Sequence, residues 1–507
     1  MYRKEAASQL KFEDFYLPFG GKLRSDNRWV ILAKQIPWQK IEEDYSANFN
    51  GLGCPAKPAR VALGSLIIKE RLGTTDRETV LQIAENPYLQ YFLGFAEYKD
   101  EVPFDHSLLT LFRKRFTQEM LAEINEAIVH NATAAEKQEK SREKSSDDDN
   151  DKPSNSGKLI IDATCTPADV AYPTDLNMLS DAREKTEEII DAMHKPFIGK
   201  REKPRTYRKE ARKNYLAVAK QKKPGYKKIR KAIGKQLNYL RRNLNNIEKM
   251  VEEGMLWCLD KRQYRLLLVV NEVYRQQRLM YEGQTHKIQG RIVSLSQPHV
   301  RPIVRGKSKS PVEFGAKISA AVVDGFGLVD RISWEAYNES GDLKTQVEKY
   351  RERFGYYPES VHADQIYRSR ENRQYCTANG IRLSGMPLGR PKTVTVENAE
   401  QLKMEKRRIY QDEIDRIAIE GKFGQGKRRF SLDRIMAKLA VTSETVIMVA
   451  FMVMNLEKIL AAVLSFLLHI WLICRITRIT ACLSACRGYL IYDQLASQPP
   501  KIHAPAG

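Results

Sequence analysis

The sequence predicts a mixed α+β fold in which helices pack on a sheet and further helices precede, interrupt and follow it. Three observations predict this fold class. Apolar residues recur at helical spacing before residue 134, β-rich runs alternate with helical segments between 158 and 440, and a long helical segment follows the first strand. The 507 residues, 42% of them hydrophobic, suffice for roughly three domains with a large core.

Residues 1–134 are expected to form a helical N-terminal domain. Apolar residues have helical spacing in RVALGSLIIKERLG, and a capping box from Thr75 to Glu78 begins the next helix. A third helix in DHSLLTLFRKRF ends with Arg113, Lys114 and Arg115. Short helices joined by tight turns, the last one basic, suit a DNA-binding domain, and a plain helical bundle fits the same pattern equally well.

Residues 135–157 contain no large apolar residue and end in an acidic run with Pro, Ser and Gly, which predicts a disordered linker. A strand then leads to Asp162, and residues 158–179 and 291–440 are expected to form one catalytic core. In its second part a hairpin over 314–337 precedes a helix, a strand that ends near Asp364, a helix, a strand and a last helix. Residues 180–290 read as a helical insertion, and 441–507 as C-terminal helices and a tail.

The positive charge is concentrated in the predicted insertion. The chain has a formal net charge of +21, which favours a polyanionic partner, and residues 195–242 hold 19 Lys or Arg against two acidic residues. Tyrosines are interleaved with them. A solvated basic hairpin would explain the pattern, but so concentrated a charge repels itself, which favours contact with nucleic acid. The predicted DNA-binding residues of this segment are Lys222, Lys223, Lys227, Lys228, Arg230, Lys231, Arg241 and Arg242.

Two further features indicate the compartment. The N-terminus has no apolar segment of signal-peptide length, and seven scattered cysteines without a C-x-x-C pair fit reduced thiols, so we expect a cytosolic protein. One apolar run, 459–474, is short for a membrane span and is bracketed by Lys458 and Arg475. It is predicted to be a buried core helix, with no membrane partner.

Three charged residues near the end of the predicted core share one face of a helix. At roughly 100° per residue, the spacing of Arg416, Glu420 and Lys427 returns them to the same stripe. For the stripe alone, paired charges on a solvated helix are the simpler explanation. Three glycines between 421 and 426 weaken a helix, however, which suggests that another molecule approaches its backbone closely.

Two further carboxylates are expected near Glu420. The predicted sheet could bring Asp162 and Asp364 side by side, with Glu420 completing the site from a helix packed on the sheet. Carboxylates of this kind bind Mg²⁺ or Mn²⁺, and two such ions about 3.5 to 4 Å apart can clamp the oxygens of a phosphodiester displacement. Arg416 and Lys427 would then neutralise phosphate charge. Any one of these acids alone is explained more simply as a cap or a surface carboxylate.

Taken together, these motifs resemble bacterial insertion-sequence transposases of the DDE class. Asp162 in LIIDATCTPADVAYPTD, Asp364 in HADQIYRSRENRQYCTANGI, and Glu420 within the Arg-x3-Glu-x6-Lys signature resemble their catalytic triad. The segments RVALGSLIIKERLGTTDRETVLQIAENPYLQYFLGF and PFDHSLLTLFRKRF resemble their N-terminal domain. This sequence departs from the group at Glu413, where a tyrosine is frequent, so either the tyrosine's role is unfilled or the pattern is looser here.

The resemblance implies a ribonuclease-H-like catalytic core that binds two Mg²⁺ or Mn²⁺ ions through the three acids. It implies cleavage of DNA at the element's ends and transfer of the freed 3′-hydroxyl groups to target DNA, with Arg416 and Lys427 on phosphate. It also implies a homodimer or larger assembly on terminal inverted repeats, at the nucleoid of a bacterial cytoplasm. The alternative is a catalytically silent, transposase-derived DNA-binding protein, although such a protein has no use for converging carboxylates.

Among lesser candidates, Asp175 is more simply a turn carboxylate than a metal ligand, and His362 a structural histidine.

Overall fold

The computed structural model describes residues 12–17, 21–49, 55–143, 155–304, 312–389, 395–396 and 398–496, with side chains except at 12, 135–143 and 470–496. Its N-terminal part is helical, as predicted. The helices are α1 (Arg28–Gln35), α2 (Trp38–Ser46), α3 (Ala59–Leu72), α4 (Asp76–Glu85), α5 (Pro87–Phe92), α6 (Leu108–Arg115) and α7 (Gln118–Glu143). Thr75 begins α4 by accepting a hydrogen bond from the backbone N–H of Glu78 at 3.2 Å.

Helix α7 changes the extent of the predicted linker. It continues to Glu143, so residues 135–143 are helical, and 144–154 lie outside the described residues. The absence of large apolar residues after 134 therefore does not end the helix, because alanine, glutamate and lysine are strong helix formers.

The N-terminal helices pack on the first half of the long helix α15 (Ala440–Ala496) and share one hydrophobic core with it and with the sheet. Arg71 of α3 donates a hydrogen bond to Glu457 at 2.5 Å, and both side chains are largely buried. The hydroxyl of Thr445 donates to the carbonyl of Arg113 at 2.7 Å. These contacts join the N-terminal part to the rest of the chain.

The sheet is mixed. Its strands are β1 (Lys158–Pro167), β2 (Arg301–Val304), β3 (Val312–Val323), β4 (Phe326–Ser333), β5 (Ser360–Ala363) and β6 (Arg382–Leu383). β3 pairs antiparallel with β1, β2 and β4, whereas β5 is parallel to both β1 and β6. The predicted hairpin is confirmed: Asp324 and Gly325 both have positive φ, the backbone that a two-residue hairpin turn requires.

Three helices accompany the sheet as predicted: α12 (Asp342–Phe354), α13 (Arg370–Ala378) and α14 (Ala399–Arg429). α14 contacts β1 and β5, and it is one uninterrupted helix despite its glycines. A buried amide ties α15 and α7 to the far edge of the sheet. Asn455 of α15 donates to Gly327 of β4 at 2.7 Å and to Asn125 of α7 at 2.9 Å.

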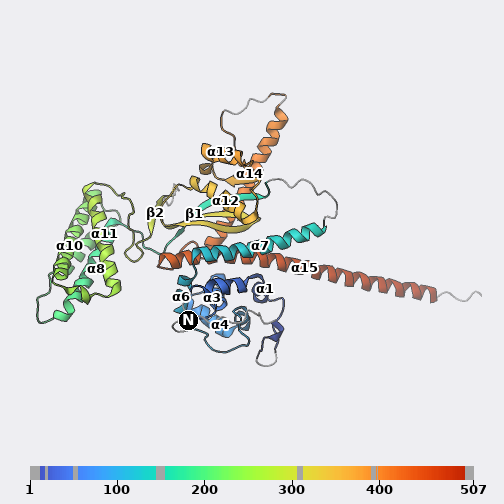
Figure 1. Cartoon of the computed structure of the whole chain (residues 1–507), viewed down its shortest axis with the longest axis horizontal. Coiled ribbons are helices and arrows are strands. Elements are labelled where there is room, and N and C mark those ends of the chain that lie inside the picture. The colour runs from blue at the N-terminus through green and yellow to red at the C-terminus, as the bar shows by residue number, and fades with distance from the viewer. Residues whose placement is uncertain are drawn as a thin grey trace, which may run out of the picture.

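The predicted insertion is a helical bundle between β1 and β2. It consists of α8 (Asp175–His194), α9 (Arg208–Ala219), α10 (Tyr226–Glu252) and α11 (Lys261–Glu282). Figure 1 shows it in green, to one side of the sheet. The bundle has its own hydrophobic core, which includes Leu179, Ile190, Leu240 and Val270. The helices begin five residues earlier than the sequence suggests, because Thr174 caps α8.

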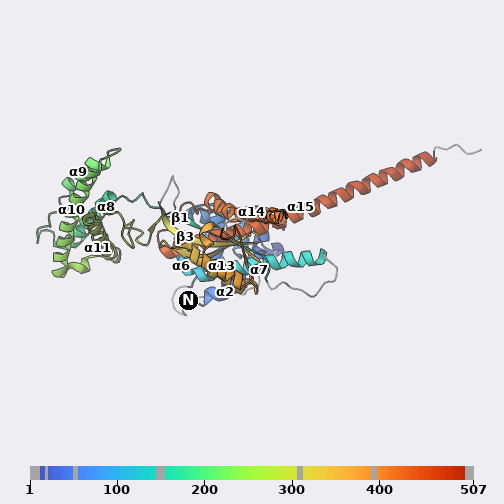
Figure 2. The same ribbon diagram turned by 90° about the horizontal axis from the view of Figure 1, so that it is seen from above.

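The C-terminal part corrects two predictions. Residues 440–496 form one helix, not several, and it runs out of the molecule beyond the sheet in both views (Figures 1 and 2). The run 459–474 is not a buried core helix as a whole, because among its described side chains only those near its start pack on the rest of the molecule. Ile459 and Leu460 are buried, but Phe466 and Leu468 are 56% and 57% exposed, and side chains from 470 lie outside the described set. Residues 440–469 are long and apolar enough to cross a membrane by length and composition alone.

Candidate active site

Two carboxylates lie at neighbouring positions on adjacent parallel strands. β1 and β5 are paired through Ile161 and Ala363; Asp162 is the next residue of β1, and Asp364 directly follows the end of β5. Because side chains alternate along a strand and Ile160 pairs with His362, Asp162 lies on the face of the sheet that carries His362. Sequence positions 202 residues apart are thus side by side at the end of β5.

Asp162 is half-buried, and its surroundings oppose its ionisation. Its pKa is raised to about 6, first by burial and then by the carboxylates of Glu339 and Asp364. The backbone N–H of Ala163, which donates to Oδ1 at 2.8 Å, and the guanidinium of Arg416 partly offset this rise. Asp162 therefore lies in a concentration of negative charge that a cation would relieve.

Arg416 and Glu420 lie on α14, one turn apart, as their spacing predicts. Nη1 of Arg416 is 2.8 Å from Oε1 of Glu420, whose side chain is 52% exposed. Burial lowers the pKa of Arg416, but Glu420, Glu413 and Asp364 more than offset this and raise it overall. Arg416 therefore lies within electrostatic reach of all three predicted catalytic acids, and in this structure it holds Glu420.

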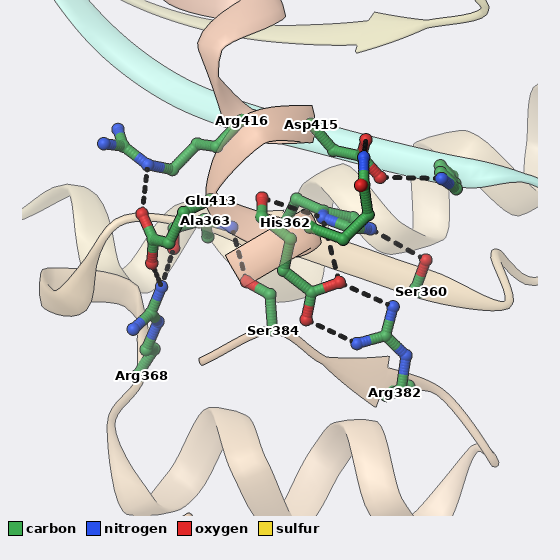
Figure 3. Close-up of polar contacts among 12 residues, drawn as sticks. Ser360, His362, Ala363, Arg368, Arg382, Ser384, Glu413, Asp415 and Arg416 are labelled. Atoms are coloured by element: carbon green, nitrogen blue, oxygen red, sulfur yellow. Dashed lines mark hydrogen bonds and ion pairs between the residues drawn. The ribbon is translucent and has the colours of Figure 1, made fainter. Parts of the chain in front are cut away.

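Glu413 occupies the position where the resemblance leads one to expect a tyrosine. Figure 3 shows it bridging two arginines. It accepts a hydrogen bond from Arg368 at 3.0 Å, which lowers its pKa, and one from Arg416 at 3.3 Å. Arg368 also donates to the carbonyl of Ala363, the last residue of β5. Glu413 therefore connects α14 to the chain around Asp364.

A buried polar network fixes α14 on the sheet below the site (Figure 3). Arg382 of β6 donates two hydrogen bonds to Asp412 of α14, at 2.6 and 2.9 Å. The buried ring of His362 lies between Ser360, at 2.9 Å from Nε2, and the carbonyl of Asp412, at 3.4 Å from Nδ1. Burial lowers the pKa of His362, so a neutral ring fits this position and a structural role.

The glycines of α14 have different surroundings. A Cβ at Gly426 would lie 2.6 Å from Cδ1 of Leu432 and 3.5 Å from the terminal methyl group of Met454 in α15. The sequence suggested that another molecule approaches the backbone of this helix closely. At Gly426, side chains of the protein's own core make that close approach. Gly421 has open space around its Cβ position. Lys427, two turns beyond Glu420, is half-buried.

The aspartates supply oxygen ligands, the donor type that Mg²⁺ and Mn²⁺ prefer, and in that respect they fit the predicted ions. Within the described part of the chain, no three His, Cys, Asp or Glu side chains are grouped closely enough to hold a metal ion. Glu420 is held by Arg416 instead of joining the aspartates. Sequence reasoning missed Glu339, since no motif or spacing connects it to β1.

The predicted DNA-binding residues of the insertion lie on and before α10. All of them are exposed except Arg230, which is half-buried and donates to the carbonyl of Tyr281 at 3.0 Å. The guanidinium of Arg242 lies 4.5 Å from the ring centre of Tyr207. The exposed Tyr226 begins α10 beside these lysines. The surface combines cationic groups with accessible aromatic rings.

Asp175, the lesser metal candidate, has a structural environment. It begins α8 and accepts hydrogen bonds from Gln277 at 3.0 Å, Arg291 at 2.8 Å and His286 at 2.9 Å. It therefore joins the two ends of the insertion.

Comparison with known proteins gives matches to two families. Residues 361–457, which include Asp364, Glu420 and Lys427, match the transposase DDE domain, and residues 18–115 match a transposase domain (DUF772). An uncharacterized protein of Rhizobium meliloti, ORF8 in the nfe locus, is 31% identical over 150 residues, which are 29% of this chain and 64% of that protein. No solved structure matches the chain. The family matches confirm the resemblance to transposases of the DDE class.

Proposed function

We propose that this chain, which carries transposase domain matches in its N-terminal part and across Asp364 and Glu420, is a DNA transposase that cuts element ends and joins them to target DNA. The observation that carries the proposal is the parallel pairing of β1 with β5 through Ile161 and Ala363, which are followed directly by Asp162 and Asp364, beside a helix that supplies Glu420. A mixed sheet with this arrangement of acids agrees with the ribonuclease-H-like core that the resemblance implies.

In this proposal Asp162 and Asp364 hold one or two Mg²⁺ or Mn²⁺ ions, and Glu420 completes the set. When bound, such ions stabilise the charge that develops on the attacking and leaving oxygens of a phosphodiester. Glu420 is 52% exposed and forms its ion pair with the side chain of Arg416, so it can turn toward the aspartates. Arg416 is then available for a DNA phosphate, with Lys427 about three turns away on the same stripe.

The DNA is proposed to extend from this site over the insertion. The exposed Lys and Arg of α10 suit contact with phosphates, and the neighbouring tyrosines suit stacking on bases. The helices of residues 1–134 are proposed as a second DNA-binding unit. The chain is proposed to act in the bacterial cytoplasm, at the nucleoid, as a homodimer or larger assembly on terminal inverted repeats.

The test is strand cleavage by the full chain on DNA that carries the element's ends, in magnesium. Asp364→Asn is expected to abolish cleavage and leave DNA binding nearly unchanged, because it removes a ligand charge and keeps the side chain's shape. Glu371→Gln, which neutralises a 76%-exposed acid on nearby α13, serves as the control and is expected to retain cleavage. Equal cleavage by the Asp364 variant and the parent would refute the assignment.

The alternative, a catalytically silent DNA-binding protein, predicts a different result in the same assay. The parent would bind the DNA ends but cleave neither strand in Mg²⁺ or Mn²⁺. The raised pKa of Asp162 disfavours this alternative, because holding a half-buried carboxylate near other acids is costly and a protein that only binds DNA gains nothing from it.

A further inference from the structure

A fourth carboxylate lies beside the candidate site. Glu339 begins a short turn, η5 (Glu339–Gly341), in the connection between β4 and α12. This turn packs on η6 (Gln365–Tyr367), the turn that follows Asp364. One side chain ties the two together, since the amide of Asn372 donates to the carbonyls of Ser340 and Tyr367, at 2.8 Å each. The position of Glu339 is therefore fixed relative to Asp364.

The carboxylate of Glu339 is held by a single lysine. Oε2 of Glu339 lies 3.3 Å from Nζ of Lys317 on β3, and the two side chains are only 20% and 14% exposed. The same Nζ donates to the carbonyl of Tyr337 at 2.9 Å, which keeps the lysine at the sheet. Lys317 balances the charge of Glu339, as Arg416 balances the charge of Glu420. In each case a metal ion could take the place of the cationic side chain.

A buried hydroxyl without a hydrogen-bond partner belongs to the turn that follows Asp364. Tyr367 is fully buried, and within the described structure its hydroxyl has no hydrogen-bond partner. Burial raises the pKa of Tyr367, and the carboxylates of Glu339, Asp162 and Asp342 add to this effect, so the hydroxyl stays protonated. A buried donor of this kind requires an acceptor, such as a carboxylate that turns inward or a water bound to a cation.

We propose that Glu339 is a further ligand of the divalent-cation site, which it forms together with Asp162 and Asp364 when it leaves Lys317, with the Tyr367 hydroxyl as its hydrogen-bond donor. This inference rests on the proposed function. It explains why the acids are not yet grouped: Lys317 holds Glu339 and Arg416 holds Glu420, so cation binding exchanges two ion pairs for two ligands. With Glu339 the site has four carboxylates, enough for two ions to share.

The test is direct binding of Mn²⁺ to the full chain, measured from the electron paramagnetic resonance signal of free Mn²⁺. Glu339→Gln is expected to raise the Kd for Mn²⁺ at least about tenfold, comparable with Asp364→Asn. The matched control is Glu335→Gln, which removes the same charge from the same connection at a 65%-exposed site and is expected to leave the Kd unchanged. Lys317→Gln is expected to lower the Kd, because it removes the competing cation.

The possible failures are distinguishable. If Asp364→Asn weakens Mn²⁺ binding but Glu339→Gln behaves like Glu335→Gln, the role of Glu339 is refuted and the proposed function stands. If the parent and Asp364→Asn bind Mn²⁺ equally, or neither binds it, the proposed function fails and this inference fails with it. Glu339→Asp keeps the charge, so weak Mn²⁺ binding by Glu339→Gln with near-parental binding by Glu339→Asp separates loss of a ligand from misfolding.

Discussion

Replacing Asp162 with asparagine should stabilise the fold at high pH. The pKa of Asp162 is about 6 in the folded chain against an ordinary 3.8. A carboxyl group whose pKa is raised in the folded state does not lower the free energy of unfolding below pH 3.8. As the pH rises from 3.8 to 6, it lowers this free energy by a growing amount, which is constant above pH 6. At about 1.4 kcal/mol per pH unit, this cost reaches about 3 kcal/mol at pH 8 and only about 1 kcal/mol at pH 4.5. Asparagine removes the charge, and its Oδ1 can still accept from Ala163.

The assay is urea unfolding of the parent and Asp162→Asn at pH 4.5 and pH 8, without divalent ions. The variant is expected to be more stable than the parent at both pH values, with an advantage about 2 kcal/mol larger at pH 8. Glu371→Gln, at an exposed acid, is the control for a general effect of charge. If the parent and Asp162→Asn lose stability equally between the two pH values, the reasoning about burial and neighbouring carboxylates is refuted.

Three further predictions concern packing, the buried network and DNA. Gly426→Ala should destabilise the fold by about 1–3 kcal/mol in urea unfolding, because its Cβ would meet the core, whereas Gly421→Ala, in open space, should be neutral or stabilising by up to about 1 kcal/mol; equal effects would contradict the packing argument. Asp412→Ala should cost about 2–4 kcal/mol by the same measurement, since it leaves the guanidinium of Arg382 without its carboxylate acceptor; a loss under about 0.5 kcal/mol would show that the network does not hold α14. Lys227→Glu combined with Lys228→Glu should weaken DNA binding and flatten its dependence on salt, and an unchanged salt slope would mean that α10 faces away from DNA.

The sequence is sufficient to predict which acids lie on neighbouring strands. A buried β-rich run that ends near Asp364 and another that holds Asp162 can pair in parallel, because the helical segments between them allow a crossover. The spacing of Arg416 and Glu420 fixes their ion pair equally well, since a helix of any packing brings residues four apart together. These are local or pattern-determined features.

What the sequence could not predict depends on packing between distant segments. Residues 461–469 of α15 are mostly exposed although they are apolar like the buried residues before them, and only the extent of the N-terminal helices and β4 decides where burial stops near Leu460. From the sequence, Gly426 only weakens a helix, because its close packing against Leu432 and Met454 is known only from the folded structure. Glu339 has no motif at all, because a turn after β4 meets a turn after β5 only in the folded chain.

The ion pair between Arg416 and Glu420 bears on how the proposed site is completed. With a carboxylate that is 52% exposed, such a pair contributes at most about 1 kcal/mol, so it is a weak obstacle to any competing charge. A divalent cation beside Asp162 and Asp364 attracts Glu420, and a DNA phosphate attracts Arg416. Either ligand therefore favours breaking the ion pair between Arg416 and Glu420, which frees the side chain that the other ligand binds. On the proposed function, cation and DNA should therefore bind cooperatively, each with higher affinity in the presence of the other. The reciprocal gain should disappear in Arg416→Gln, where no pair has to be broken, and its persistence there would show that Arg416 does not couple the two.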